Sequence, residues 1–226
     1  MFARLRENML ALLRWSEGYT KTDMVYATRG GFWLSLAKGA GLFSSLLFAV
    51  AMANLIPPEV FGTYKFVISG VAIIGSFSLT GVGIAIIQAG ARGYEGTLHQ
   101  GTKMYLKWSF GIIAISGAVA IYYFLNGNSV LAISFLIAGT CSPIIIGFSF
   151  FGQFLSGKKD FKTFSIYDTL RNVAPAFVLI ATVFLTSDPI LIILVFFVSS
   201  VVTNVLLYYS TVQKYRPNDK TDPQSI

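Results

Sequence analysis

The amino-acid sequence predicts an all-α membrane protein, a bundle of six transmembrane helices with both termini in the cytoplasm. Three observations lead to this fold class. The chain of 226 residues is 54% hydrophobic and 12% charged, whereas about 25% of the residues in a soluble domain are charged. Its mean hydropathy is +0.67, and its apolar residues form long uncharged runs. Its lysines and arginines gather between alternate runs.

Each predicted span is an apolar run of roughly 20 residues, the length that crosses a bilayer as an α-helix. The uncharged run at 108–157 is too long for one span, and the Asn-Gly-Asn-Ser turn at 126–129 divides it in two. Ser187, Asp188 and Pro189 mark a helix start before the last run. We therefore expect spans at about 32–56, 66–91, 108–125, 130–155, 164–186 and 189–213.

The basic residues predict the orientation of this six-helix lobe, residues 30–213, because lysine and arginine are enriched in cytoplasmic loops. Fourteen of the 17 basic residues precede the first span, follow the last, or lie in the connections after the second and fourth spans. The connections on the other side hold only Lys65. Both termini are therefore expected in the cytoplasm, and the net charge of +7 needs no nucleic acid as a partner.

The segments outside this lobe are basic or polar. Residues 1–29 hold Phe2, Leu5 and Met9 at helical spacing with arginines interspersed, which predicts a basic amphipathic helix on the cytoplasmic surface. Residues 214–226 are predicted to form a polar tail.

The residue inventory argues against an enzyme and against a bound metal or cofactor. The chain has one cysteine and one histidine, Cys141 and His99, too few for the usual metal clusters. It lacks the Walker GxxxxGK[ST], GxSxG and HExxH patterns. We therefore expect neither nucleotide-driven transport nor hydrolysis within this chain.

Three charged residues inside the predicted spans form the candidate site. Lys38 lies about 6 residues, or roughly 9 Å, into the first span, and Arg171 about 7 residues, or roughly 10 Å, into the fifth. A charge at the bilayer centre costs about 2.5–3.5 kcal/mol, so two cations at one depth indicate a shared polar cavity. Asp168 precedes Arg171 by one helical turn and is expected to orient it or to exchange protons.

Each cation also has a simpler interpretation. The long side chain of Lys38 can extend its ammonium toward the headgroups, and Arg171 can serve only as the structural partner of Asp168. If both face a cavity, a phosphate-bearing ligand suits them, because arginine binds phosphate through a bidentate fork and lysine as a point charge.

Three stretches resemble motifs of one family. "NLIPPEVFGTYKF" at 54–66 is similar to the loop between the first two helices of bacterial polysaccharide flippases of the O-antigen type. These flippases belong to the multidrug/oligosaccharidyl-lipid/polysaccharide exporter superfamily. "SLTGVGIAIIQAGARG" at 78–93 resembles the glycine-rich end of their second helix, and "FLSGKKDFKTFS" at 154–165 resembles their loop between helices four and five. The resemblance spans roughly residues 24–212.

The resemblance implies a transporter lobe that flips an undecaprenyl-diphosphate-linked oligosaccharide across the bacterial inner membrane, for surface polysaccharides such as the O-antigen of lipopolysaccharide. Lys38 and Arg171 would bind this anionic lipid-linked sugar. The family usually has twelve or more helices in two lobes. By this resemblance the chain looks like the N-terminal lobe, and we expect it to be a truncated product, half of a split transporter or a subunit that pairs with itself. A second six-helix lobe, either a separate chain or another copy, is then expected as a partner.

Two other functions fit the same residues. One is a lobe of a multidrug-type exporter, for which an acidic residue in the spans would bind a cationic drug; Asp168 is the one such residue in the predicted spans. The other is a non-transporting or truncated membrane subunit.

Overall fold

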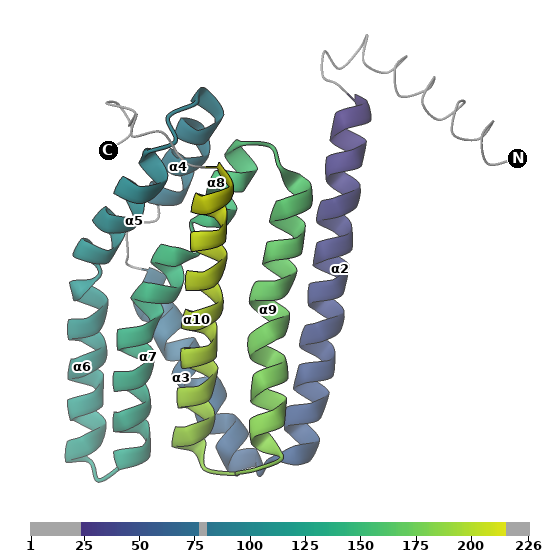
Figure 1. Ribbon diagram of the computed structural model, residues 1–226. Coiled ribbons are helices and arrows are strands. Elements are labelled where there is room, and N and C mark those ends of the chain that lie inside the picture. Colours follow the sequence, from purple (N-terminus) through teal and green to yellow (C-terminus); the bar gives the residue numbers. More distant parts are fainter. Residues whose placement is uncertain (1–23, 77–80, 216–226) are drawn as a thin grey trace, which may run out of the picture.

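The structure, a computed structural model, describes residues 24–76 and 81–215, and all regular secondary structure within these ranges is α-helix (Figure 1). The predicted all-α fold class is therefore confirmed. The predicted N-terminal amphipathic helix and polar tail lie largely outside the described residues. The helices are α2 (Met24–Leu55), α3 (Pro58–Ser76), α4 (Gly81–Arg92), α5 (Thr97–Trp108), α6 (Phe110–Leu125), α7 (Ser129–Phe148), α8 (Phe151–Gly157), α9 (Phe161–Val183) and α10 (Pro189–Tyr215).

Within the described residues, five spans are long and apolar enough to cross a membrane, and a sixth is present if one bent helix pair counts as a span. α2, α9 and α10 are single spans, while α5 joins α6 and α7 joins α8 to make two more. The bent pair is α3 with α4. The beginning of α2 and the end of α10 lie at the same end of the bundle, as an even number of crossings requires (Figure 1). We call this the basic end, and its cytoplasmic location stays a prediction.

The second predicted span differs most from the structure. The sequence predicted one helix over 66–91 after a loop, whereas α3 already begins at Pro58 and makes an angle of 67° with α4. Proline is favoured in a first helical turn, where its missing N–H would have no partner. The carbonyl of Pro57 accepts the N–H groups of Val60 and Phe61, which closes that turn. The helix therefore starts about two turns earlier than the apolar pattern indicates.

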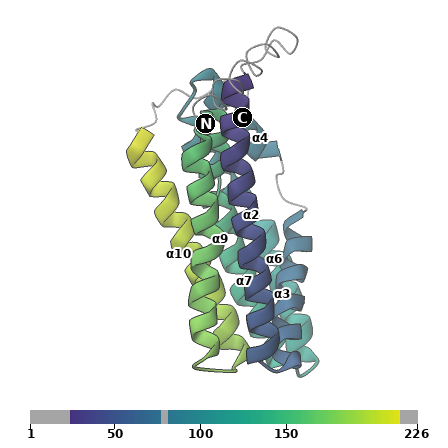
Figure 2. The same ribbon diagram turned by 90° about the vertical axis from the view of Figure 1, so that its right-hand side faces the viewer.

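Two hydrophobic clusters fill the bundle. One, around Val67, Phe135 and Leu179, joins α2, α3, α7, α9 and α10 away from the basic end. The other, around Phe151 and Tyr208, joins α4, α5, α8 and α10 at the basic end. α2 contributes only to the first cluster and packs mainly along α9, at the edge of the bundle (Figure 2). A pocket opens beside the middle of α2, from Lys38 to Phe48.

Close contact between α4 and α8 fixes the basic end. A Cβ atom added to Gly157 would lie 2.5 Å from the backbone oxygen of Ile87 and 3.3 Å from the amide nitrogen of Ala91. Only glycine allows the two backbones to approach so closely. The glycine-rich stretch 78–93 and the loop stretch 154–165 thus contact each other.

A polar cluster fixes the beginning of α9 to the end of α10. The carboxylate of Asp160 accepts hydrogen bonds from the N–H of Thr163 at 3.1 Å, from the Thr163 hydroxyl at 2.6 Å, from Lys214 at 3.0 Å and from the hydroxyl of Tyr215. Burial opposes ionisation of this carboxyl, but the hydrogen bonds outweigh burial and hold the pKa of Asp160 well below its usual range. The helix that carries Asp168 is therefore anchored at its first turn.

Gly157→Ala tests the contact between α4 and α8. The added methyl group cannot stay 2.5 Å from the carbonyl oxygen of Ile87, so we expect a loss of about 1–3 kcal/mol in stability, as for other overpacked contacts. Thermal unfolding of the purified protein in detergent measures this loss. Gly111→Ala in α6 is the matched control, because nothing lies within 4 Å of its added Cβ. Equal unfolding temperatures for the two variants would contradict the contact.

Candidate functional site

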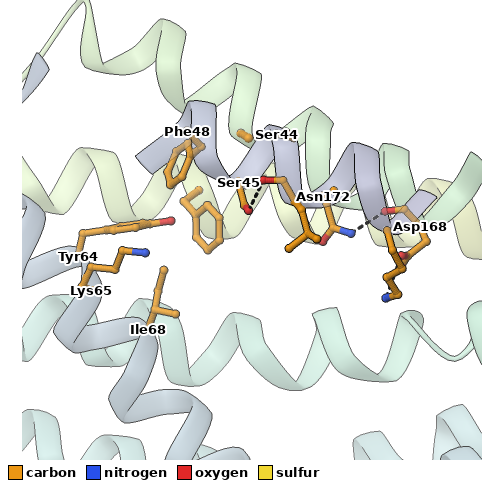
Figure 3. Close-up of a pocket in the computed structure, with 13 residues that line it drawn as sticks. Ser44, Ser45, Phe48, Tyr64, Lys65, Ile68, Asp168 and Asn172 are labelled. Atoms are coloured by element: carbon orange, nitrogen blue, oxygen red, sulfur yellow. Dashed lines mark hydrogen bonds and ion pairs between the residues drawn. The ribbon is translucent and has the colours of Figure 1, made fainter. Parts of the chain in front are cut away.

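A pocket of about 460 Å³ opens between α2, α3 and α9, with Phe196 of α10 in its wall. It runs along α2 from Lys38 to Phe48, a helical length of about 15 Å. Figure 3 shows Asp168 at one end, Tyr64 and Lys65 at the other, and Ser45 and Asn172 between them. The polar and charged lining comes from three helices: Lys38, Ser44 and Ser45 from α2, Tyr64 and Lys65 from α3, and Asp168 and Asn172 from α9.

Asp168 joins the two cations that the sequence singled out. Its carboxylate lies 3.0 Å from a guanidinium nitrogen of Arg171 and 3.8 Å from the ammonium of Lys38. The aspartate is 8% exposed, so its charge needs a partner, and Arg171 one turn further along α9 supplies it. The structure thus places Lys38 and Arg171 at the same level, on either side of one carboxylate. The three groups together carry a net positive charge.

The two cations stand in different environments. The side chain of Lys38 is 74% exposed and lines the pocket, and its contact with Asp168 is long. The side chain of Arg171 is 33% exposed, makes the shorter contact and is not among the residues that line the pocket. Lys38 is therefore free to meet a ligand, whereas Arg171 reaches the pocket only through the carboxylate it holds.

Hydrogen bonds to the backbone position the polar groups between the two ends. The hydroxyl of Ser45 donates to the carbonyl of Leu42 at 2.8 Å, and the amide nitrogen of Asn172 donates to the carbonyl of Asp168 at 2.7 Å. The amide oxygen of Asn172 and the lone pairs of the serine hydroxyl stay available as acceptors. This part of the pocket therefore offers hydrogen-bonding groups without charge.

The sequence did not identify Tyr64 and Lys65 as pocket residues. It placed Lys65 in a loop, because the apolar run begins only at Phe66. The adjacent prolines at 57 and 58, followed by Glu59, are a helix-start signal that would have extended the helix over both residues. The two side chains would then have lain inside a span.

The apolar spans and the polar pocket between them define a multi-pass α-helical membrane protein. Within that class the family follows from a family model described as "Polysaccharide biosynthesis protein", which matches residues 27–226; the chain belongs to this family of polysaccharide biosynthesis and flippase proteins. The resemblance drawn from the three sequence stretches is thereby confirmed. Members of the family are associated with transport rather than catalysis. No curated protein and no solved structure matches the chain.

Asp168→Asn tests which cation depends on the carboxylate. Removing the negative charge leaves the half-buried Arg171 without its ion-pair partner, so we expect a loss of about 1–3 kcal/mol in stability. Lys38→Gln removes only a long and exposed contact and should cost less than about 1 kcal/mol. Thermal unfolding of both variants in detergent gives the comparison. A larger loss for Lys38→Gln than for Asp168→Asn would contradict the different environments of the two cations.

Proposed function

We propose that this chain is a lobe of a flippase that moves an undecaprenyl-diphosphate-linked oligosaccharide from the cytoplasmic to the periplasmic leaflet of the bacterial inner membrane. The diphosphate binds at the end of the pocket where Lys38 meets Asp168. One observation supports this proposal most. The chain belongs to a family of polysaccharide biosynthesis proteins, and it has an exposed lysine, Lys38, in a pocket between its spans. This lysine is only weakly paired with a single carboxylate, that of Asp168.

An exchange of partners explains how the site would bind a phosphate. The ammonium of Lys38 leaves Asp168 for the diphosphate, because a contact of 3.8 Å at an exposed lysine is weak. Arg171 keeps Asp168 neutralised during the exchange, since its 3.0 Å contact does not involve the pocket. Asp168 therefore acts first as the group that orients Arg171. Proton exchange at Asp168 would couple to transport only when the arginine moves away.

The paired state of Asp168 also weighs against a multidrug-type exporter. A cationic drug needs an uncompensated acid in the pocket, whereas this carboxylate already contacts two cations. Among the described lining residues the other charged groups are lysines. The pocket therefore favours an anion over a cation.

We infer that a second six-helix lobe, from another copy or from a separate chain, covers α2. Alternating access requires two lobes that rock about a shared site. α2 packs mainly on α9, and a Cβ on Gly41, which lines the pocket, would meet nothing within 4 Å, so a second helix can approach this face closely.

A disulfide crosslink checks this partner. We expect Gly41→Cys in a Cys141→Ser background to form a crosslinked species in native membranes, either a dimer or a product with a second chain. Leu125→Cys, exposed at the far end of α6, is the control that should not crosslink. A single uncrosslinked band for both variants would contradict the proposal that a second lobe covers α2.

Loss of the cationic pocket should abolish transport. We expect Lys38→Ala combined with Arg171→Ala to reduce surface polysaccharide at least about tenfold, because the contact of Lys38 with the diphosphate, worth about 1.5–3 kcal/mol, is lost and Asp168 no longer has Arg171 to neutralise it. The measurement is the amount of surface polysaccharide in cells that depend on this protein, at equal protein level. Lys103→Ala on the exposed side of α5 is the control. Unchanged polysaccharide in the double variant would refute the role of this pocket.

A further inference from the structure

Tyr64 brings a hydroxyl to the end of the pocket opposite Asp168. The residue is 3% exposed, and its ring packs against Phe48 and edge-on against Phe196, with centroids 6.2 and 5.4 Å away. Its hydroxyl lines the pocket and forms no hydrogen bond with the described residues, so it is available to a ligand there. Figure 3 shows this hydroxyl pointing toward the interior of the pocket.

Lys65 places a cation at the same end of the pocket. Its ammonium lies 5.4 Å from the centre of the Phe61 ring, and no carboxylate in the described part of the chain forms an ion pair with it. This distinguishes Lys65 from Lys38, which already has Asp168 nearby. The end of the pocket near α3 therefore carries an uncompensated positive charge together with an unused hydrogen-bonding group.

The wall around these groups suits a sugar. Sugar rings combine hydroxyl edges with apolar C–H faces, and they pack well where aromatic rings stand beside a few placed polar groups. Here Phe48, Tyr64 and Phe196 form the aromatic wall, and Ser45 and Asn172 lie between it and Asp168. The distance of about 15 Å along α2 leaves room for sugar units between the two ends.

We propose that Tyr64 and Lys65 form a sugar subsite at this end of the pocket. Lys65 binds the carboxylate of an acidic sugar such as a uronic acid, and the Tyr64 hydroxyl hydrogen-bonds to the sugar beside it. The subsite rests on the proposed function, because it takes the head of the same lipid-linked oligosaccharide whose diphosphate binds at Lys38. It assigns the cargo to the class of acidic oligosaccharides.

Direct binding to the purified full chain tests the subsite. The protein is placed in nanodiscs of phosphatidylcholine, which lack anionic headgroups, and three probes are titrated by calorimetry. Digalacturonic acid reports on the subsite, galactobiose is its neutral counterpart, and farnesyl diphosphate reports on the Lys38 end. We expect wild-type protein to bind digalacturonic acid at least about tenfold more tightly than galactobiose, as a charge-assisted contact predicts.

The variants separate the two ends. Lys65→Gln should weaken the binding of digalacturonic acid at least about tenfold and the binding of farnesyl diphosphate much less. Lys38→Gln should weaken the binding of farnesyl diphosphate more than the binding of digalacturonic acid. Tyr64→Phe should weaken the binding of both disaccharides several-fold, because hydroxyl groups of either sugar can hydrogen-bond to the Tyr64 hydroxyl. Lys103→Gln, on the exposed side of α5, is the control and should change none of the three affinities.

The outcomes distinguish the subsite from the proposed function. Binding of farnesyl diphosphate through Lys38, with no effect of Lys65→Gln on the acidic disaccharide, would overturn the subsite alone. If wild-type protein does not bind farnesyl diphosphate but binds digalacturonic acid through Lys65, the diphosphate site would be overturned and the subsite supported. Equal affinity of wild-type protein for the two disaccharides, or no saturable binding of either, would also overturn the subsite.

Discussion

The carboxylate of Asp168 is the constraint around which the pocket is arranged. A carboxylate in a membrane span is stable only beside a cation, and removing its partner would leave a buried charge uncompensated. Arg171 meets this need from one turn away on the same helix, at 3.0 Å. Because the arginine suffices, Lys38 on α2 can contact the carboxylate loosely, at 3.8 Å, and remain exposed to the pocket. Arg171 therefore neutralises the carboxylate, and Lys38 remains as a cation that can bind a ligand.

The bundle positions this carboxylate through contacts far from the pocket. Asp160 fixes the first turn of α9 to the end of α10, and Gly157 lets the preceding helix α8 rest directly on the backbone of α4. With α9 anchored in this way, α2 has one helix to pack along, and its other side is left open. The pocket beside α2 thus depends on the polar cluster that holds α9 at the basic end.

Composition and charge placement were enough to predict the class of protein, because a long apolar run without charge has few alternatives to a membrane span. They also identified Lys38, Asp168 and Arg171, since charges stand out within such runs. Tyr64 and Lys65 were missed because an apolar run marks contact with lipid or core, whereas the start of α3 is set by the hydrogen bonding of its first turn at Pro58. The bend of 67° between α3 and α4 leaves no signal in the apolar pattern, which stays apolar from α3 through α4.

The serines and the asparagine of the pocket were beyond sequence reasoning for a different reason. Small polar residues are common in membrane helices, where their side chains bond to the carbonyl one turn back, as Ser45 and Asn172 do here. Such a bond looks the same whether the residue faces lipid, a neighbouring helix or a cavity. Only the placement of α2 beside α9 shows that these two residues share one space.

The two lysines of the pocket are not equivalent, because in the described part of the chain only Lys38 has a carboxylate nearby. At Lys38 an incoming anion competes with Asp168, so a group with several negative charges displaces the carboxylate more readily than a single carboxylate would. At Lys65 no competing carboxylate is present in the described residues, so one negative charge is enough. Under the proposed function, the diphosphate, which carries several negative charges, is assigned to the end near Asp168, and the singly charged acidic sugar to the end near Tyr64. Asp168 would then take the ammonium of Lys38 back when the diphosphate leaves.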